Sequence, residues 1–250
     1  MTDSRDMLLQ NYDKRIDLLD PDIETKLSWF RLYIHRHYME YLQAYETDSA
    51  QILDIGCSRG YSLRVFQEHG FSNLKGIDVS CNDIEAAKKI VPEADFECTD
   101  VFEYLQANPQ FFDIILIKAV LEHIPKNQVI PLLQLIKSSL KPNGIVLVDV
   151  PNMDWLFATH ERYMDFTHEV GFTKESMAQL LGLLFNSYKV KALDNGIKTH
   201  WLPRLKTNFA RMILGTLLRW ADYEGAHNPI WARSLLGIGQ VNDDNLPSVN

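Results

Sequence analysis

The sequence has few cysteines and no long apolar run, and each shortage excludes a class of protein. Its 250 residues include three cysteines, Cys57, Cys81 and Cys98, at no spacing typical of a metal site. This pattern predicts small buried thiols in a reducing cytoplasm rather than a zinc centre. No stretch approaches the roughly 20 apolar residues of a membrane span, so no transmembrane segment is expected.

Positive charge is also in short supply. The chain has 25 basic and 33 acidic residues, a net charge of −8 and a pI of about 5.5. This balance opposes non-specific binding to nucleic acid, so no nucleic-acid partner is expected. The first residues, MTDSRDMLLQNYDKR, contain no apolar core of signal-peptide length and carry acids throughout, which favours a cytoplasmic protein.

Short apolar runs alternate with helix-like stretches along most of the chain. The runs are residues 51–55, 74–78, 111–117 and 144–150, and the helical stretches between them are 60–69, 82–90 and 126–140. Near-continuous apolar strands that alternate with helices predict a doubly wound α/β fold, in which helices cover both faces of a parallel sheet. Residues 187–194 and 230–241 are expected to add a sixth and a last strand.

The chain divides into three expected parts. Asp20-Pro21 predicts a helix N-terminus, because aspartate caps helices well and proline suits the first helical position. Apolar residues follow at helical spacing, so residues 1–48 are expected to form a helical cap. Residues 49–241 would form the α/β domain, and residues 242–250 a loosely held tail.

An amphipathic helix is expected at residues 205–221, inserted between the last two strands. Its apolar residues fall on one stripe: Leu205, Phe209, Met212, Ile213, Leu217 and Trp220. Packing on the domain is the favoured interpretation. A lid over the site, a dimer contact and docking on a lipid-linked substrate are the alternatives.

The stretch ILDIGCSRG, residues 52–60, points to the ligand. A glycine-rich turn after the first strand is where open α/β sheets bind nucleotides, but the spacing Gly56-x-Ser58-x-Gly60 fits the dinucleotide fingerprint poorly. Asp54 at the strand end would repel a pyrophosphate and attract a cationic ligand. S-adenosylmethionine carries an ammonium and a sulfonium group and no phosphate.

These residues resemble the first motif of the class I S-adenosylmethionine-dependent methyltransferases, which is an apolar pair, an acid and G-x-G-x-G. Ser58 stands in the place of the middle glycine. Later motifs follow in the family's order, so that the resemblance covers about residues 50 to 195: Asp78, ECTDVFEY, FDIILIKAVLEHI and LKPNGIVLVDVPN. The resemblance implies a Rossmann-like seven-stranded sheet with an antiparallel last strand, and S-adenosylmethionine as the cofactor.

The resemblance also implies roles for single residues. Asp78 would accept from the ribose hydroxyls, Asp100 from the adenine amino group, and the Val101 amide would meet the adenine ring. The expected cofactor site comprises Asp54, Gly56, Cys57, Ser58, Gly60, Asp78, Val79, Asp100, Val101 and Lys118. The alternative for such acids is a helix cap or a turn, and that alternative is preferred for Asp83, Asp95 and Asp113.

The acceptor would lie over the ends of the fourth and fifth strands, which makes His123 a candidate catalytic residue. Ubiquinone-type O-methyltransferases carry a similar stretch with a further acid three residues before the Glu-His pair, and that set can hold a divalent metal. Ala119 occupies that position here, so no metal is expected. His123 could instead pack or cap the next helix.

A second candidate is His168, with Asp165 to orient its ring. The arrangement D-x-T-H … F-T-x-x-S resembles methyltransferases of bacterial glycan biosynthesis. A sugar hydroxyl has a high pKa, so methyl transfer to it benefits from a general base. His160 and His168 could instead fix the loop through hydrogen bonds.

The sequence therefore predicts a methyltransferase that acts on an oxygen of a sugar or glycan precursor, or on another small-molecule acceptor. One alternative is methylation of a small metabolite or a quinone-like ring. The other is a non-catalytic methyltransferase-like binding module. A homodimer is possible on either interpretation.

Overall fold

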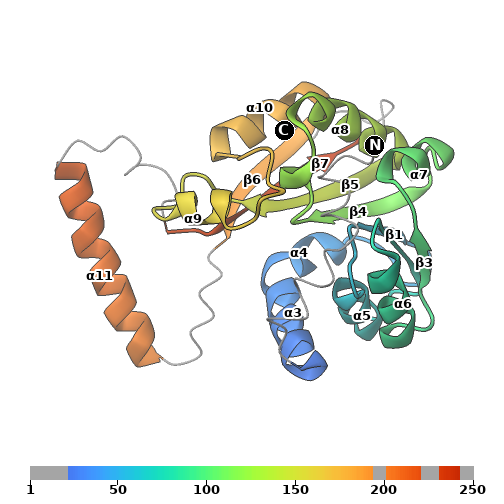
Figure 1. Cartoon of the computed structure of the whole chain (residues 1–250), viewed down its shortest axis with the longest axis horizontal. Helices are drawn as coiled ribbons and strands as arrows, with labels where there is room; N and C mark the ends of the chain where they lie inside the picture. Colours follow the sequence, from blue (N-terminus) through green and yellow to red (C-terminus); the bar gives the residue numbers. More distant parts are fainter. Residues whose placement is uncertain (1–21, 194–200, 221–230, 243–250) are drawn as a thin grey trace.

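The computed structural model describes residues 22–193, 201–220 and 231–242 (Figure 1). Seven strands form one sheet in the order β3-β2-β1-β4-β5-β7-β6. Their bounds are β1 (Gln51–Ile55), β2 (Asn73–Asp78), β3 (Asp95–Cys98), β4 (Phe112–Lys118), β5 (Leu140–Pro151), β6 (Ser187–Leu193) and β7 (Ser234–Gln240). The strands from β1 to β5 pair in parallel, and β7 runs antiparallel to both β5 and β6. The predicted fold class is confirmed.

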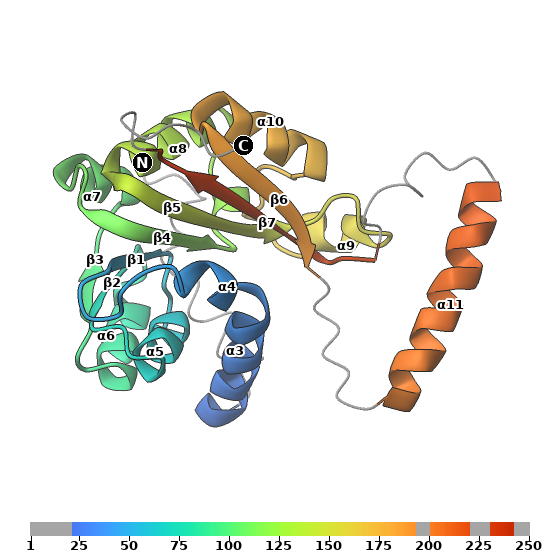
Figure 2. The ribbon, with the colours of Figure 1, turned by 180° about the vertical axis from the view of Figure 1, so that it is seen from behind.

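Helices cover both faces of this sheet, as Figures 1 and 2 show. One face carries α3 (Ile23–His37), α4 (Met39–Leu42), α5 (Tyr61–Glu68) and α6 (Cys81–Ile90), and the other carries α7 (Val101–Ala107), α8 (Lys126–Ser139) and α10 (Lys174–Leu184). Successive strand residues point to opposite faces, so Ile52 and Ile114 join the first core while Leu53 and Ile115 join the second. Both faces are buried, which is why the strands read as continuous apolar runs.

The N-terminal helix α3 begins two residues later than the sequence predicts. The side chain of Asp22 caps it by accepting from the Thr25 amide at 3.0 Å. Asp22 is therefore the cap, and Asp20 and Pro21 lie outside the described residues.

Two tyrosines join the N-terminal helices to the sheet. The Tyr33 hydroxyl donates to the Asp149 carboxylate at 2.5 Å, and the Tyr38 hydroxyl donates to the same oxygen. All three side chains are buried. Burial raises the pKa of Asp149, while the Lys118 charge and the two phenols oppose that rise. These bonds keep the helices seated on the end of β5.

Helix α11 (Trp201–Trp220) lies between β6 and β7, as predicted. The expectation that its apolar stripe packs on the domain is wrong: Phe209 is 61 % exposed, Leu217 53 % and Trp220 87 %. No helix in the described ranges is long and apolar enough to cross a membrane. The expected parts 1–48, 49–241 and 242–250 stay a prediction, since most of the tail lies outside the described residues.

Candidate functional site

The glycine-rich turn between β1 and α5 has a backbone that only small residues fit. Gly56 has φ +68°, and a Cβ built there would lie 2.2 Å from a Val120 methyl carbon. Gly60 has φ +77° and precedes the first residue of α5. Ser58 also has a positive φ, +46°, in the region that favours glycine, which explains why the related motif has glycine at this place.

Two acids stand beside this turn. Asp78 at the end of β2 accepts from the Ser58 amide at 2.9 Å and from the Ser80 amide at 2.8 Å, so it holds the turn in shape. Asp54 at the end of β1 is 2 % exposed. Burial raises the pKa of Asp54 to about 7; the Lys118 charge lowers it and the Asp78 charge raises it further.

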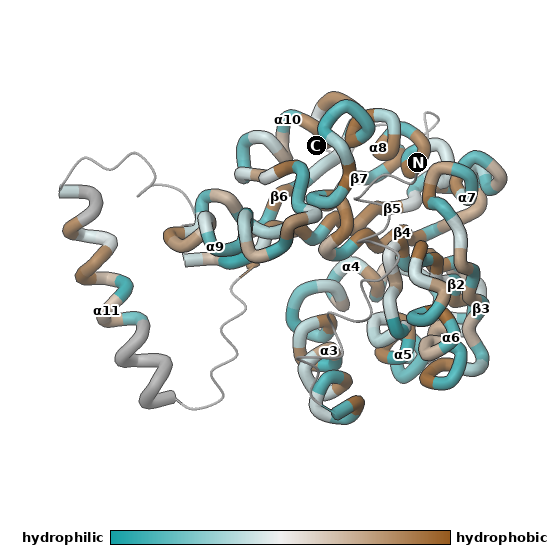
Figure 3. The backbone as a smooth tube through the Cα atoms, viewed as in Figure 1, coloured by the Kyte–Doolittle hydropathy of each residue, from teal (hydrophilic) through white to brown (hydrophobic). Residues whose placement is uncertain are grey.

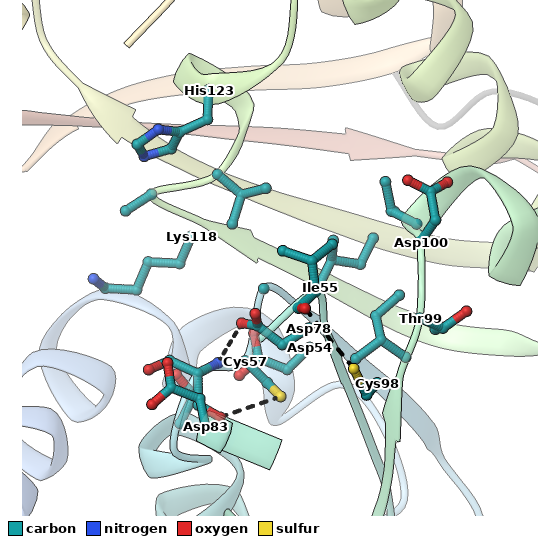
Figure 4. Close-up of a pocket in the computed structure, with 18 of the residues that line it drawn as sticks. Asp54, Ile55, Cys57, Asp78, Asp83, Cys98, Thr99, Asp100, Lys118 and His123 are labelled. Atoms are coloured by element: carbon teal, nitrogen blue, oxygen red, sulfur yellow. Dashed lines mark hydrogen bonds between the residues drawn. The ribbon is translucent and has the colours of Figure 1, made fainter. Parts of the chain in front are cut away.

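A cavity of about 1130 Å³ opens over the carboxyl ends of the parallel strands. Its lining includes every predicted cofactor residue except Gly60: Asp54, Gly56, Cys57, Ser58, Asp78, Val79, Asp100, Val101 and Lys118. This volume is enough for a drug-sized ligand with room to spare. Figure 4 shows His123 and Lys118 at one end of the cavity, and Thr99 and Asp100 at another.

Asp100 and Asp83 line the cavity, and each also bonds another residue of the chain. The Asp100 carboxylate caps α7, accepting from the Phe102 amide at 2.8 Å, so this acid is both a cap and a cavity residue. Asp83 is not the simple cap or turn acid that the sequence indicates. It is buried, and it pairs with Arg59 of the glycine-rich turn at 3.2 Å.

The expectation that all three cysteines are buried thiols is wrong for two of them. Cys81 and Cys98 form a disulfide, both are exposed, and both line the cavity. The β2–β3 pairing causes this, because Asp78 lies opposite Cys98 and α6 begins with Cys81 three residues after Asp78. Cys57 is a buried free thiol, as expected.

A hydrogen-bonded chain reaches His123 at the acceptor end of the cavity. Thr167 donates its hydroxyl proton to Asp165 at 2.7 Å, and the same hydroxyl oxygen lies 2.8 Å from His123 Nδ1. Because the Thr167 hydroxyl proton is donated to Asp165, the Thr167 oxygen can only accept from His123. His123 Nδ1 therefore carries the hydrogen, and Nε2 is the nitrogen that would accept a proton. The predicted carboxylate partner of His168 therefore acts on His123 instead.

His168 is held by the backbone. Its Nδ1 donates to the Glu161 carbonyl at 2.8 Å, because a carbonyl oxygen can only accept. The amides of Glu169 and Val170 donate to the Glu122 carbonyl at 2.8 and 3.1 Å. These bonds place the His168 ring 4.7 Å from that of His123. His168 and Asp165 are not part of the cavity lining, whereas His123 is.

Glu122 completes a group of potential metal ligands. One ligand atom from each of Glu122, His123 and His168 lies within 4.8 Å of the others, so these residues could hold a divalent cation. Glu122 is buried, one of its oxygens has no hydrogen-bond partner among the described residues, and burial raises its pKa to about 8. The expectation of a site without metal stays a prediction.

Sequence reasoning missed the residues that act on others. Thr167 contacts the His123 ring and the Glu161 carbonyl accepts from His168. These contacts arise because the chain after β5 folds back onto the turn after β4, and no local sequence pattern indicates them. The aromatic face of α3 was missed too: Lys118 Nζ lies 5.5 Å from the ring centres of Trp29 and Tyr33. The dense aromatic pattern of WFRLY was the available signal, and it was used only to predict a helix.

Comparison with known proteins agrees with this geometry. A family model described as a methyltransferase domain matches residues 29–196. A ubiquinone biosynthesis O-methyltransferase from Rhodopseudomonas palustris is 36 % identical over 110 residues, 42 % of this chain and 41 % of the relative. A malonyl-[acyl-carrier protein] O-methyltransferase from Halalkalibacterium halodurans is 25 % identical over 169 residues, 65 % of this chain and 56 % of the relative. The chain thus spans less than half the length of the ubiquinone relative.

Solved structures share the fold. A methyltransferase from Archaeoglobus fulgidus described as SAM-dependent superposes with a TM-score of 0.66 and 20 % identity, covering 86 % of this chain and 94 % of its own. The plantazolicin methyltransferase BpumL superposes with a TM-score of 0.58 and 19 % identity, covering 93 % of this chain and 89 % of its own. The family match, the strand order and the residues of the turn lead to one conclusion: the chain belongs to the methyltransferase-domain family.

Proposed function

We propose that the protein transfers the methyl group of S-adenosylmethionine to an oxygen of a small-molecule acceptor that carries a hydroxyl. The observation that carries this proposal is His123 at the acceptor end of the cavity, with the ring of His168 4.7 Å from its own. In both rings Nδ1 is engaged in a hydrogen bond, so Nε2 is the nitrogen that would accept a proton. A neutral imidazole so fixed is suited to accept a hydroxyl proton as the methyl group is transferred.

Each group in the cavity would have a separate task. Asp54, Asp78 and Asp100 would hold the cofactor, with the acids toward its cationic and hydroxyl-bearing parts. His123 would take the proton, because it lines the cavity and the Asp165–Thr167 pair fixes its tautomer. Positioning of the two reactants for in-line displacement would supply most of the rate. The narrower expectation of a sugar acceptor rests on the resemblance of residues 165–176.

A labelled-cofactor screen tests this proposal. The full chain is incubated with methyl-labelled S-adenosylmethionine and separate sets of sugars, phenols and carboxylic acids. We expect labelled product from a hydroxyl-bearing set. With that acceptor, His123→Gln should slow the single-turnover methyl transfer about 10²–10⁴-fold while cofactor affinity is kept. His160→Gln, at an exposed histidine of α9 (Ala158–Tyr163), is the matched control.

Two results would contradict the proposal. Labelling confined to carboxylic acids would mean that the acceptor needs no deprotonation. A hydroxyl acceptor methylated at the same rate by wild type, His123→Gln and His168→Gln would show that neither histidine is the base, and positioning alone would then carry the reaction.

A further inference from the structure

Helix α11 presents one side to the rest of the chain and the opposite side outward. The Arg211 guanidinium carbon lies 5.8 Å from the ring centre of Trp231, and a Cβ on Gly215 would lie 3.9 Å from the same ring. Phe209 and Ile213 are each two positions from one of these residues, which is about 200° around a helix. The apolar stripe therefore faces away from Trp231.

The outward stripe is broad and exposed. Five of its side chains expose between 45 % and 87 % of their surface: Phe209, Met212, Ile213, Leu217 and Trp220. Figure 3 shows apolar residues along the described part of α11, and Figures 1 and 2 show the helix standing apart from the sheet and its covering helices. So much contiguous apolar surface marks an interaction site.

The charge of α11 indicates what covers the stripe. Between Trp201 and Trp220 the sequence has four basic residues and no acidic one, although the whole chain has a net charge of −8. Pairing with α11 of a second copy would bring two basic helices together. An anionic surface would instead attract the basic residues of the helix. Docking on that surface would also remove the apolar stripe from water.

A second group of exposed apolar side chains lies at the same end of the molecule. Phe157 is 60 % exposed, Tyr163 75 % and Phe166 92 %, all in or beside α9. Both ribbon views place α9 between the sheet and α11. Aromatic residues of this kind are frequent where proteins meet the headgroup region of a bilayer.

We propose that α11 docks on an anionic phospholipid surface. The helix would lie in the interface plane with Phe209, Ile213 and Leu217 in the boundary between headgroups and acyl chains. The net positive charge of the helix would attract it to the anionic headgroups. The proposal concerns this surface and is independent of the acceptor.

Vesicle sedimentation with the full chain tests the proposal. We expect the protein to sediment with vesicles of phosphatidylcholine mixed with phosphatidylglycerol, and to stay in solution with phosphatidylcholine alone. High salt should weaken the binding, because it screens the basic residues. Leu217→Glu should weaken it about tenfold or more, since it places a charge in the apolar boundary.

The matched control is Leu183→Glu, the same change at a leucine of α10 that is 66 % exposed. It should bind vesicles as the wild type does. Thermal unfolding of both variants, and of Phe209→Glu as a second change in the stripe, shows that they are folded.

Three outcomes would overturn the proposal: no binding of the wild type to mixed vesicles, equal binding with and without phosphatidylglycerol, or equal loss in Leu217→Glu and Leu183→Glu. A dimer that dissociates in Leu217→Glu, without vesicle binding by the wild type, would assign the stripe to a second copy of the chain.

Discussion

Burial raises the pKa of the Asp54 carboxyl group to about 7. Asp54 lines the cavity in which a cationic ligand is expected. The unliganded protein therefore keeps a proton there below neutral pH. A bound cation favours the ionised carboxylate, so binding expels that proton. The affinity of the protein for S-adenosylmethionine should accordingly fall as the pH drops below about 7.

Titration calorimetry between pH 6 and 8 measures this effect. The dissociation constant should rise with falling pH by at most about tenfold per unit, as one proton requires. Asp54→Asn should bind more weakly and lose this pH dependence. If the variant kept the wild-type slope, another group would be the one that titrates.

Thr167 transmits the Asp165 charge to His123. Thr167→Val keeps the shape of the side chain and removes the oxygen that accepts from Nδ1. The imidazole then loses the bond that fixes its tautomer, and we expect the turnover number to fall about tenfold with little change in cofactor affinity. Thr167→Ser restores the hydroxyl and should restore the rate. A rate unchanged in Thr167→Val would show that the tautomer needs no such support.

At the scale of secondary-structure elements, the disulfide joins the start of α6 to the end of β3. The two cysteines are separated by 17 residues in sequence. Closing a loop of this length stabilises a protein by about 3 kcal/mol through the unfolded state. Cys98→Ser should therefore lower the melting temperature.

Reduction supplies the control for that prediction. Dithiothreitol should lower the melting temperature of the wild type toward that of Cys98→Ser and leave the variant unchanged. Equal melting temperatures of the untreated wild type and Cys98→Ser would mean that the bridge adds no stability.

The elements differ in how far the sequence could predict them. Strands β1 and β4 are buried on both faces, so each is a near-continuous apolar run. Gly56 belongs to a motif with a fixed spacing. The bond between His123 and Thr167 spans 44 residues, and no local pattern encodes it. The exposed stripe of α11 was misassigned because amphipathic spacing says which side is apolar and not what covers it.

At the scale of the whole molecule, two buried tyrosines join the N-terminal helices to the sheet. Tyr38→Phe removes one of two hydrogen bonds to the buried Asp149 carboxylate. A hydrogen bond to a charged group is worth about 1.5–3 kcal/mol, so we expect a loss of that size in the free energy of unfolding. Urea denaturation measures it. Tyr188→Phe, at a tyrosine of β6 that is 48 % exposed, should cost far less.

The same two tyrosines have a consequence for the way a ligand reaches the cavity. Helix α3 borders the cavity through Lys26 and Phe30, in the position of a gate. To swing open, it would have to break both phenol bonds and leave the buried Asp149 carboxyl without them. We therefore expect the cofactor to enter and leave with α3 in place, and the amide hydrogens around Tyr33 to exchange with water more slowly than those of the first turn of this helix.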